Sequence, residues 1–359
     1  MLVHICCSVD SHYFLQKLKK EHPNEKLIGF FYDPNIHPYS EYYLRLLDVK
    51  RSCKMLGVEL VEGIYDTASW LKSVSGLENE PEKGARCSVC FDDRLEISAQ
   101  KAKELEENTF TSTLLVSPKK SIAQLKKSGN IIAKRYELTF ITPDYRLNGG
   151  TQEQNIIAKQ DKLYRQDYCG CLFGLTQQRE QQKKIADELF SPLSTQILPD
   201  SIEEKIELYE KRCRLEEKSQ KYIIKKERFL NYRLKRAYVS CKDQVIASHF
   251  LPYSTLQKGY TRGKIMWGEK MGYLNRDEVL FITLAHYNEM GNANYKDVRA
   301  LIYNPPSFKK ELQIRKKLTQ NPYNLSTIIV LQEKINAKLE IYSQSEIYED
   351  IRQIIKLTD

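Results

Sequence analysis

Short apolar runs alternate with helix-like segments through the first 145 residues of this 359-residue chain, and this alternation limits the folds open to it. The runs have the length of strands, and the segments between them repeat apolar residues at helical spacing. The runs are LVHICC, LIGFFYDPN, VELVEG, TFTSTLLVSP and YELTFITPD. Because parallel strands need crossover connections, strands that alternate with helices form a parallel sheet with helices on both faces. We therefore predict an α/β domain built on a parallel sheet.

The intervening segments indicate where helices end and where a site would form. SEYYLRLLDVKRSCKMLG has helical periodicity with Gly57 as a C-cap, and KKSIAQLKKSGN is predicted to be a helix that ends near Gly129. Ligands of parallel sheets bind beyond the carboxyl ends of the strands. We therefore expect the polar residues after the first, second and fourth runs to meet at one edge of the sheet; they are CCS, DPNIHPYSE and TSTLLVSP.

The sequence changes character near residue 177, so we predict two domains, 1–176 and 177–359. SIEEKIELYEKRCRLEEKSQKYIIKKERFLNYRLKRAYV is predicted to form one long or two shorter amphipathic helices, and VSCKDQVIASHFLP alternates as strands do. YTRGKIMWGEKMGYLNRDE is aromatic and punctuated by glycine. The second domain is thus predicted to be a mostly helical α+β extension.

The excess positive charge is concentrated in this extension. Residues 1–176 have 24 basic and 23 acidic side chains, whereas residues 177–359 have 32 and 24. A basic surface favours polyanions such as nucleic acid through counterion release. A solvated helical face rich in lysine is the alternative interpretation.

Composition places the chain among ordinary globular proteins, with 41% hydrophobic and 29% charged residues. No apolar run approaches the roughly 20 residues that span a bilayer, and the start, MLVHICCSVD, lacks the basic region and cleavage site of a secretory signal. We therefore expect no membrane partner and a cytoplasmic location. The sequence does not indicate an oligomeric state.

Six of the nine cysteines are grouped, and all six lie in the first half of the chain: Cys6, Cys7, Cys87, Cys90, Cys169 and Cys171. Cytosolic thiols are kept reduced, so their spacing indicates chemistry rather than disulfides. Thiolates are soft ligands for zinc, copper(I) or iron–sulfur clusters. Six exceed the four that one zinc or one cluster needs, which favours a cluster with a second metal or with a redox pair. Buried structural thiols are the alternative, and the spacing does not choose between zinc and iron.

Five motifs occur in an order that resembles the cobalamin-independent epoxyqueuosine reductases, the QueH family, over about residues 1–175. They are HICCSVD, FFYDPNIHPYSEYYLR, RCSVCFDDRL, FTSTLLVSP and LYRQDYCGC. The resemblance implies a Rossmann-like, adenine-nucleotide-hydrolase-like domain with a [4Fe–4S] cluster and an additional iron ion. It also implies the last step of queuosine biosynthesis, an oxidoreductase reaction in which the epoxide of the modified tRNA base becomes an alkene. Residues 177–359 carry no motif that we can place.

The same resemblance assigns the six grouped cysteines as ligands of the cluster or of the additional iron. It makes Asp10 a candidate oxygen ligand to that iron, although an N-cap of the following helix is an equal alternative. The chain departs from the family pattern at Asp33, at Gly174 and in the segment TQEQN. These departures bear on substrate contacts and leave the metal ligands intact.

Reduction of an epoxide needs electrons from a cofactor and an external electron donor, and it needs a proton donor. The candidate catalytic residues in or beside the motifs are Asp10, His37, Glu41, Tyr164 and Tyr168. Four arginines recur there and would suit phosphate or form ion pairs with acidic neighbours; they are Arg45, Arg86, Arg94 and Arg165.

The predicted partner is tRNA with a queuosine-type anticodon loop. In the extension, IIKKERFLNYRLKR interleaves cations with aromatic residues and is a candidate tRNA contact, or else an amphipathic helix whose aromatics face its own core. Two rival functions are a tRNA-thiolation-type enzyme and a metal-stapled RNA-binding protein with structural cysteines. The absence of glycine from CCSVDSH, where a phosphate loop would follow the first strand, disfavours the first rival.

Overall fold

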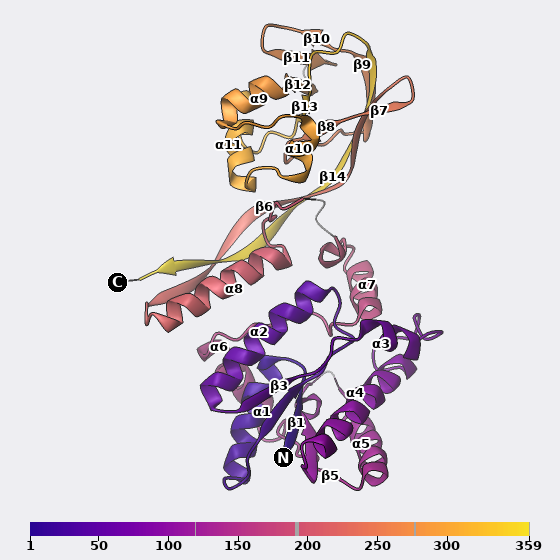
Figure 1. Cartoon of the computed structure of the whole chain (residues 1–359), viewed down its shortest axis with the longest axis vertical. Helices are drawn as coiled ribbons and strands as arrows, with labels where there is room; N and C mark the ends of the chain where they lie inside the picture. Colours follow the sequence, from indigo (N-terminus) through magenta and orange to yellow (C-terminus); the bar gives the residue numbers. More distant parts are fainter. Residues whose placement is uncertain (119, 191–193, 276–277, 359) are drawn as a thin grey trace. The chain divides into compact units, whose positions relative to one another are not determined.

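The computed structural model describes residues 1–118, 120–190, 194–275 and 278–358 (Figure 1). These divide into two compact units, Met1–Glu188 and Leu189–Asp359. The division falls later than the predicted 176/177, because residue 177 lies inside a helix, α7 (Leu172–Gln181), that belongs to the first unit.

The first unit is built on a five-stranded parallel sheet with the order β3-β2-β1-β4-β5. All five predicted strands are present: β1 (Leu2–Ile5), β2 (Ile28–Phe31), β3 (Glu59–Glu62), β4 (Thr109–Ser112) and β5 (Thr139–Phe140). β1 and β2 are buried on both faces, as expected for central strands of a sheet covered on both sides.

The described residues of the first unit form seven α-helices: α1 (Ser8–Glu21), α2 (Tyr39–Leu56), α3 (Thr67–Ser73), α4 (Ala85–Glu104), α5 (Ile122–Tyr136), α6 (Gly150–Gln160) and α7. α1 packs against α2 and α6 on one side, and α4 packs against α3 and α5 on the other (Figure 1). The Rossmann-like α/β fold is therefore confirmed for the first unit.

Two glycines show how the helix ends compare with expectation. Gly57 is the left-handed C-cap of α2 at φ +60°, as predicted. The prediction that the next such helix ends near Gly129 is wrong, since α5 continues to Tyr136. A Cβ at Gly129 would lie 2.1 Å from the Phe140 ring, so this glycine allows α5 to approach β5 closely and does not end the helix. Lys119, the first residue of the predicted segment KKSIAQLKKSGN, lies outside the described residues.

The second unit has two sheets. One has the order β10-β11-β12-β13-β8, and the other has the order β7-β6-β14-β9. The strands are β6 (Tyr222–Cys241), β7 (Gln244–Ile246), β8 (Ser248–Phe250), β9 (Tyr260–Lys264), β10 (Met266–Trp267), β11 (Met271–Leu274), β12 (Val279–Thr283), β13 (Thr327–Leu331) and β14 (Lys338–Leu357). The helices are α8 (Ile202–Glu217), α9 (Leu284–Gly291), α10 (Val298–Tyr303) and α11 (Phe308–Thr319). The predicted aromatic, glycine-punctuated segment forms β9 to β11, and its residues 276–277 lie outside the described part.

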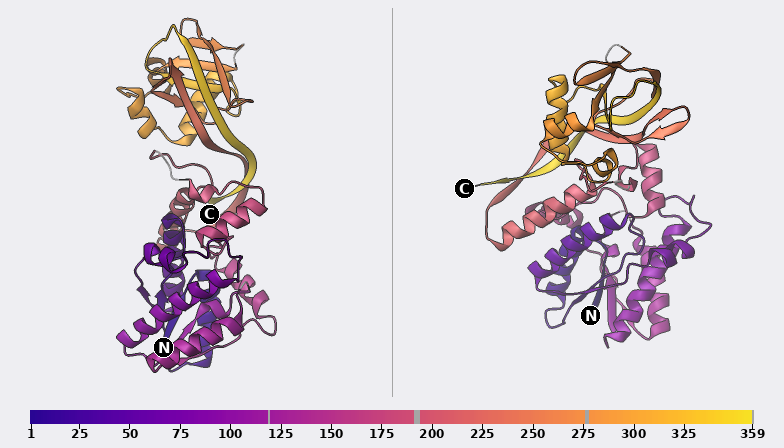
Figure 2. Two further views of the ribbon diagram at one scale, coloured as in Figure 1. Left: turned by 90° about the vertical axis from the view of Figure 1, so that its right-hand side faces the viewer. Right: turned by 45° about the horizontal axis from the view of Figure 1, so that its top comes forward.

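The prediction of a mostly helical extension is wrong in its central segment. Only α8 is helical there, and Tyr222–Cys241 form one 20-residue strand, which pairs antiparallel with β14 along its length (Figure 2). Alternation explains the outcome, because Val239 and Ile341 point into a core while their neighbours Tyr238 and Tyr342 do not. The segment forms a strand rather than a helix because it pairs with β14, which lies about 100 residues later in the chain and which no local sequence pattern can reveal.

The second unit is layered. Residues between its two sheets form one apolar cluster, which includes Val239, Leu339 and Phe281. A second cluster, which includes Leu280 and Leu301, lies between the first of these sheets and the helices α9 to α11. In the part of the chain that the structure describes, we find no helix of the length and apolarity that a bilayer crossing requires.

Candidate metal centre

The order of the first unit's sheet places a crevice at the ends of β1 and β4. The chain moves from β1 outward through β2 to β3, and the later strands β4 and β5 lie on the other side of β1. At such a switch point, neighbouring connections leave the strand ends in opposite directions and open a binding crevice. Cys6 and Cys7 follow β1 directly, and Thr113 follows β4. The backbone N–H of Cys6 donates to Thr113 Oγ1 at 3.4 Å, so the two connections meet.

Cys6, Cys7 and Asp10 form one group of donor atoms at this crevice. The two sulfurs are 3.9 Å apart, and the ligand atoms of all three residues lie within 4.8 Å of one another. Cys7 is the N-cap of α1, and Asp10 lies in the first turn. The alternative that Asp10 is an N-cap is therefore wrong. Two thiols and one carboxylate at this spacing suit a single transition-metal ion with positions left open.

Burial shapes the protonation of this group. Burial raises the pKa of Asp10 to about 6, although Gln154, whose Nε2 donates to Asp10 Oδ1 at 2.7 Å, acts in the opposite direction. Hydrogen bonding with Cys6 and then burial raise the pKa of Cys7 well above its usual value. A metal ion competes with these protons, so binding would release them.

The other four cysteines come from a helix and a loop. Cys87 and Cys90 are three residues apart in the first turns of α4 and so share one helix face. Cys169 and Cys171 flank Gly170, and Cys171 is the N-cap of α7. Cys90 and Cys171 belong to one buried cluster, which also contains Trp70 and Val74. The helix and the loop thus bring C-x-x-C and C-x-C together.

Gly170 is required in this loop for two reasons. Its φ is +110°, in the region that only glycine enters readily. A Cβ at this position would also lie 2.8 Å from Ile36 Cγ1 and 3.1 Å from Arg45 Nη1. The loop is drawn against the turn after β2, where the His37 N–H donates to the Gly170 carbonyl at 2.8 Å.

A buried polar network supports the loop from behind. Arg45 Nη1 donates to the Cys169 carbonyl at 3.0 Å, and Nη2 donates to the Tyr168 carbonyl at 3.1 Å. Glu41 forms a buried ion pair with Arg45 at 2.7 Å and accepts the Tyr164 hydroxyl at 2.9 Å. The contacts of Glu41 and Tyr164 are those of residues that position the loop, while their expected role as proton donors stays a prediction.

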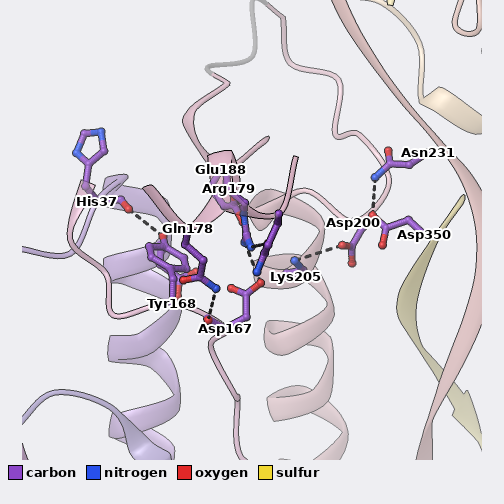
Figure 3. A network of polar contacts seen from close by, with 12 residues as sticks. His37, Asp167, Tyr168, Gln178, Arg179, Glu188, Asp200, Lys205, Asn231 and Asp350 are labelled. Atoms are coloured by element: carbon purple, nitrogen blue, oxygen red, sulfur yellow. Dashed lines mark hydrogen bonds and ion pairs between the residues drawn. The ribbon is translucent and has the colours of Figure 1, made fainter. Parts of the chain in front are cut away.

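The residues before and after the loop are also fixed (Figure 3). Arg179 of α7 pairs with Asp167 at 2.8 Å and with Glu188, and Gln178 Nε2 donates to the Asp167 carbonyl at 3.1 Å. Tyr168 donates its hydroxyl to the His37 carbonyl at 2.8 Å.

The half-buried ring of His37 points away from the Tyr168 contact in Figure 3. Burial lowers the pKa of this imidazole, so it is neutral at neutral pH. The His37 backbone thus supports the loop, while its ring points elsewhere.

Cations surround the thiols. Lys120 Nζ lies 3.0 Å from Cys169 Sγ. Burial by itself would raise the pKa of the Cys169 thiol, but Lys120, with Arg94 and Arg45, outweighs burial and lowers it. Lys120 also acts on Cys87, Cys90 and Asp10, so its charge reaches both donor groups.

The predicted arginines serve different purposes. Arg94 is buried and pairs with Asp33, which explains why a carboxylate stands at this departure from the family pattern. Arg86 donates to the Glu78 carbonyl at 2.6 Å and lies over the Phe173 ring at 5.5 Å. Arg165 donates to Asn155 at the surface. Three of the four predicted arginines are thus buried and bind groups within the protein.

Sequence reasoning missed Lys120 and Gln154. Lys120 follows the fourth predicted strand, in VSPKK, and that position beyond a strand end was the available signal. Gln154 lies in α6, which was not predicted, and its segment TQEQN was noted only for substrate contacts, without a link to Asp10. Six thiols, one buried carboxylate and a surrounding set of cations are a donor set that fits sulfur-ligated iron, whose thiolate-rich clusters carry net negative charge.

Comparison with known proteins identifies the family of this chain. A family model described as Epoxyqueuosine reductase QueH matches residues 1–177. The Epoxyqueuosine reductase QueH of Helicobacter pylori is 40% identical over 363 residues, which cover 98% of this chain and 98% of that protein. That of Thermotoga maritima is 31% identical over 189 residues, which cover 52% of this chain and 95% of that protein. Among solved structures, the U34-tRNA thiolase NcsA from Methanococcus maripaludis with its [4Fe-4S] cluster is 17% identical, with a TM-score of 0.34 over 60% of this chain and 73% of that one. The near-complete match to the Helicobacter pylori protein, extension included, establishes that the chain belongs to the QueH family of epoxyqueuosine reductases.

Proposed function

We propose that this chain reduces epoxyqueuosine in tRNA to queuosine with two iron centres held by separate donor groups. Cys87, Cys90, Cys169 and Cys171 would hold a [4Fe–4S] cluster, and Cys6, Cys7 and Asp10 would hold one additional iron ion. The observation that supports this proposal is that thiols from distant parts of the chain form two chemically different donor groups, one with a carboxylate and one without, and that the charge of Lys120 acts on both.

The chemistry of each donor group supports this division. Four cysteines without a carboxylate are the usual ligand set of a [4Fe–4S] cluster. Two thiols with a carboxylate leave an iron ion with open positions for an oxygen ligand. When bound, the cluster supplies electrons singly and the iron supplies Lewis acidity toward an epoxide oxygen. Removal of that oxygen consumes two electrons and two protons and releases water, so an external electron donor is required.

The protein's own residues hold protons and charge around this chemistry. Lys120 Nζ lies within reach of both donor groups and carries protons next to Cys169. His37, on the turn after β2, would be a second proton donor, through the ring N–H of its neutral imidazole. Asp10 is oriented by Gln154, which fixes one carboxylate oxygen and leaves the other for the metal. Glu41 and Tyr164 hold the Cys169 loop through Arg45.

The experiment combines metal analysis with product analysis. Protein purified anaerobically should contain about five irons and four acid-labile sulfides per chain. Cys169→Ser should lose the sulfide, Cys6→Ser should keep it and lose about one iron, and Cys53→Ala, which alters a core thiol outside both groups, should match the wild type. With dithionite as electron donor, the wild type should convert epoxyqueuosine in tRNA to queuosine, detected by mass spectrometry of the nucleosides.

Two outcomes would overturn the proposal. A protein that holds zinc without sulfide, or an iron-loaded protein that leaves epoxyqueuosine unchanged, would favour a metal-stapled RNA-binding protein instead. A cytoplasmic location is part of the proposal, since reduced thiols and tRNA substrates are found together there.

A further inference from the structure

The outer face of one sheet in the second unit presents aromatic and basic side chains. In the sheet β7-β6-β14-β9, residues of the inner face such as Val239, Leu339 and Ile341 pack into the apolar core against the other sheet. Side chains alternate along a strand, so the residues between them belong to the opposite, outer face. Arg236, Arg262 and other polar residues of that face are exposed.

Three tyrosines form a row across three strands of this outer face. Tyr342 of β14 pairs in register with Tyr238 of β6 on one side and with Tyr260 of β9 on the other. The ring centroids are 4.5 Å apart for Tyr238 and Tyr342, and 4.7 Å apart for Tyr260 and Tyr342. Tyr260, at the end of the row, is 39% exposed.

Positive charge flanks the row. The Arg236 guanidinium lies 5.1 Å from the Tyr238 ring and 5.0 Å from the Tyr342 ring. Beyond Tyr260, the same face continues with Arg262 and Lys264 of β9, and Lys338 stands opposite Lys264. Glu340, paired with Arg262 at 3.2 Å, is the acidic residue in register on this part of β14. Four cations against one carboxylate leave this patch strongly positive.

Aromatic rings with interspersed arginine and lysine on an exposed sheet are the chemistry that binds single-stranded nucleic acid. Unpaired bases stack on tyrosine or on arginine planes, and the cations contact phosphates. A protein partner with an acidic surface would need the charges but not a three-ring row. Because of the ring row, the observations favour RNA with unpaired bases over a protein.

Relatives differ in whether they contain the second unit, and this difference bears on the function of the face. The Thermotoga maritima relative is covered to 95% by a match to 52% of this chain, the family model matches residues 1–177, and the Helicobacter pylori relative is matched over 98% of both proteins. The second unit is thus an addition to the family's reductase domain. Positions 177–359, which include this unit, contain 32 of the 56 basic residues.

We propose that the outer face formed by Arg236, Tyr238, Tyr260, Arg262, Lys264, Lys338 and Tyr342 binds a single-stranded segment of the RNA substrate. This rests on the proposed function for the identity of the RNA, but not for the binding itself. Bases stack on the exposed end of the tyrosine row and against Arg236. The phosphates follow the basic side chains of β9 and the start of β14.

The test measures RNA binding by the full chain, with unmodified RNA so that reductase activity plays no part. The probe is an anticodon stem-loop with a queuosine-type anticodon, compared with a blunt duplex of the stem sequence. The charge variant is Arg262→Gln with Lys264→Gln and Lys338→Gln. Its control removes three exposed lysines of α11, with Lys309→Gln, Lys310→Gln and Lys316→Gln.

Removal of three phosphate contacts should lower the slope of log Kd against log salt by about two. The α11 control should keep the wild-type slope. Tyr260→Leu keeps an apolar side chain but removes the ring, and it should weaken stem-loop binding about 5- to 50-fold with little effect on the duplex. Tyr303→Leu, which alters an exposed tyrosine of α10, is its control and should bind as the wild type does.

The outcomes separate the face from the reaction. A tyrosine row that only stabilises the sheet would lower the melting temperature of Tyr260→Leu and leave RNA affinity unchanged, which would overturn the proposal. Unchanged salt slopes in the folded charge variant would also overturn it. If the wild type binds RNA through this face but fails the reductase assay, the proposed function is refuted and the binding face is not.

Discussion

The substitution Gly170→Ala tests whether the C-x-C loop positions its two sulfurs through a backbone that only glycine allows. At φ +110°, alanine is strained by about 1–3 kcal/mol. The added Cβ would also contact Ile36 Cγ1 at 2.8 Å, and neither Ile36 nor the neighbouring Arg45 can move freely, because both are buried. A total of about 2–3 kcal/mol corresponds to a fall of roughly 4–12 °C in melting temperature for a unit of this size.

The loop can relieve this strain by moving, and the move would displace Cys169 and Cys171. We therefore expect Gly170→Ala to lose most of its acid-labile sulfide and its cluster absorption when purified anaerobically. Gly57→Ala is the matched control, since Gly57 has φ +60° with no atom within 4 Å of an added Cβ. It should cost about 1–2 kcal/mol in stability but retain the cluster. A Gly170→Ala protein with wild-type iron and sulfide would refute this account of the loop.

Three further predictions concern the charges around the site. Lys120→Met removes an ammonium 3.0 Å from Cys169 Sγ and should make the cluster harder to reduce, by about 50 mV or 1 kcal/mol in an EPR-monitored titration; an unchanged potential would contradict it. Burial raises the pKa of Asp10 to about 6, so below that pH protons compete with a metal ion for its carboxylate. The affinity for cobalt(II), measured by absorbance, should therefore weaken as pH falls through 6. Asp10→Asn should abolish this pH dependence. Glu41→Ala leaves Arg45 buried without its partner and should cost about 3–5 kcal/mol in urea unfolding, whereas Tyr164→Phe should cost about 0.5–1.5 kcal/mol; equal costs would argue against the network.

Stability without metal should depend on pH in the opposite direction to metal binding. Burial raises the folded-state pKa of both Asp10 and Asp33 to about 6, above the unfolded value near 4. The folded state therefore holds these protons more tightly than the unfolded chain. Their contribution to stability is complete below about pH 4 and is lost as pH rises through 6.

The strands of the first unit were predictable because their signal is local. Each run is a short apolar segment bounded by polar residues, and β1 and β2 are buried on both faces. The order of the sheet then placed Cys6 and Thr113 at one crevice by a general rule for parallel sheets. The sequence did not predict how the sulfurs divide into two groups, because that depends on the contact between α4 and a loop some 80 residues later.

Lys120 and Gln154 show a second limit. Each approaches its partner through tertiary contact alone, with Lys120 at Cys169 and Gln154 at Asp10. A lysine near a strand end is ordinary in sequence, and only its distance from a thiol gives it meaning. β6 shows the third limit, since an alternating pattern rich in long cations resembles an amphipathic helix until its partner β14 is known.

The two units divide the requirements of a reductase that acts on a base within RNA. The donor atoms for both proposed iron centres come from the first unit, from Cys6 to Cys171, so binding of the metals needs no ligand from the second. An RNA substrate is long and charged, and a crevice lined by thiols and buried cations contacts only a small part of it. A separate basic face would raise the affinity for the remaining RNA without altering the metal environment. In kinetic terms, loss of the face through Arg262, Lys264 and Lys338 should raise KM for tRNA and leave kcat unchanged, whereas loss of Lys120 should lower kcat. A fall in kcat in the face variant, with the cluster intact, would show that the second unit takes part in the reaction itself.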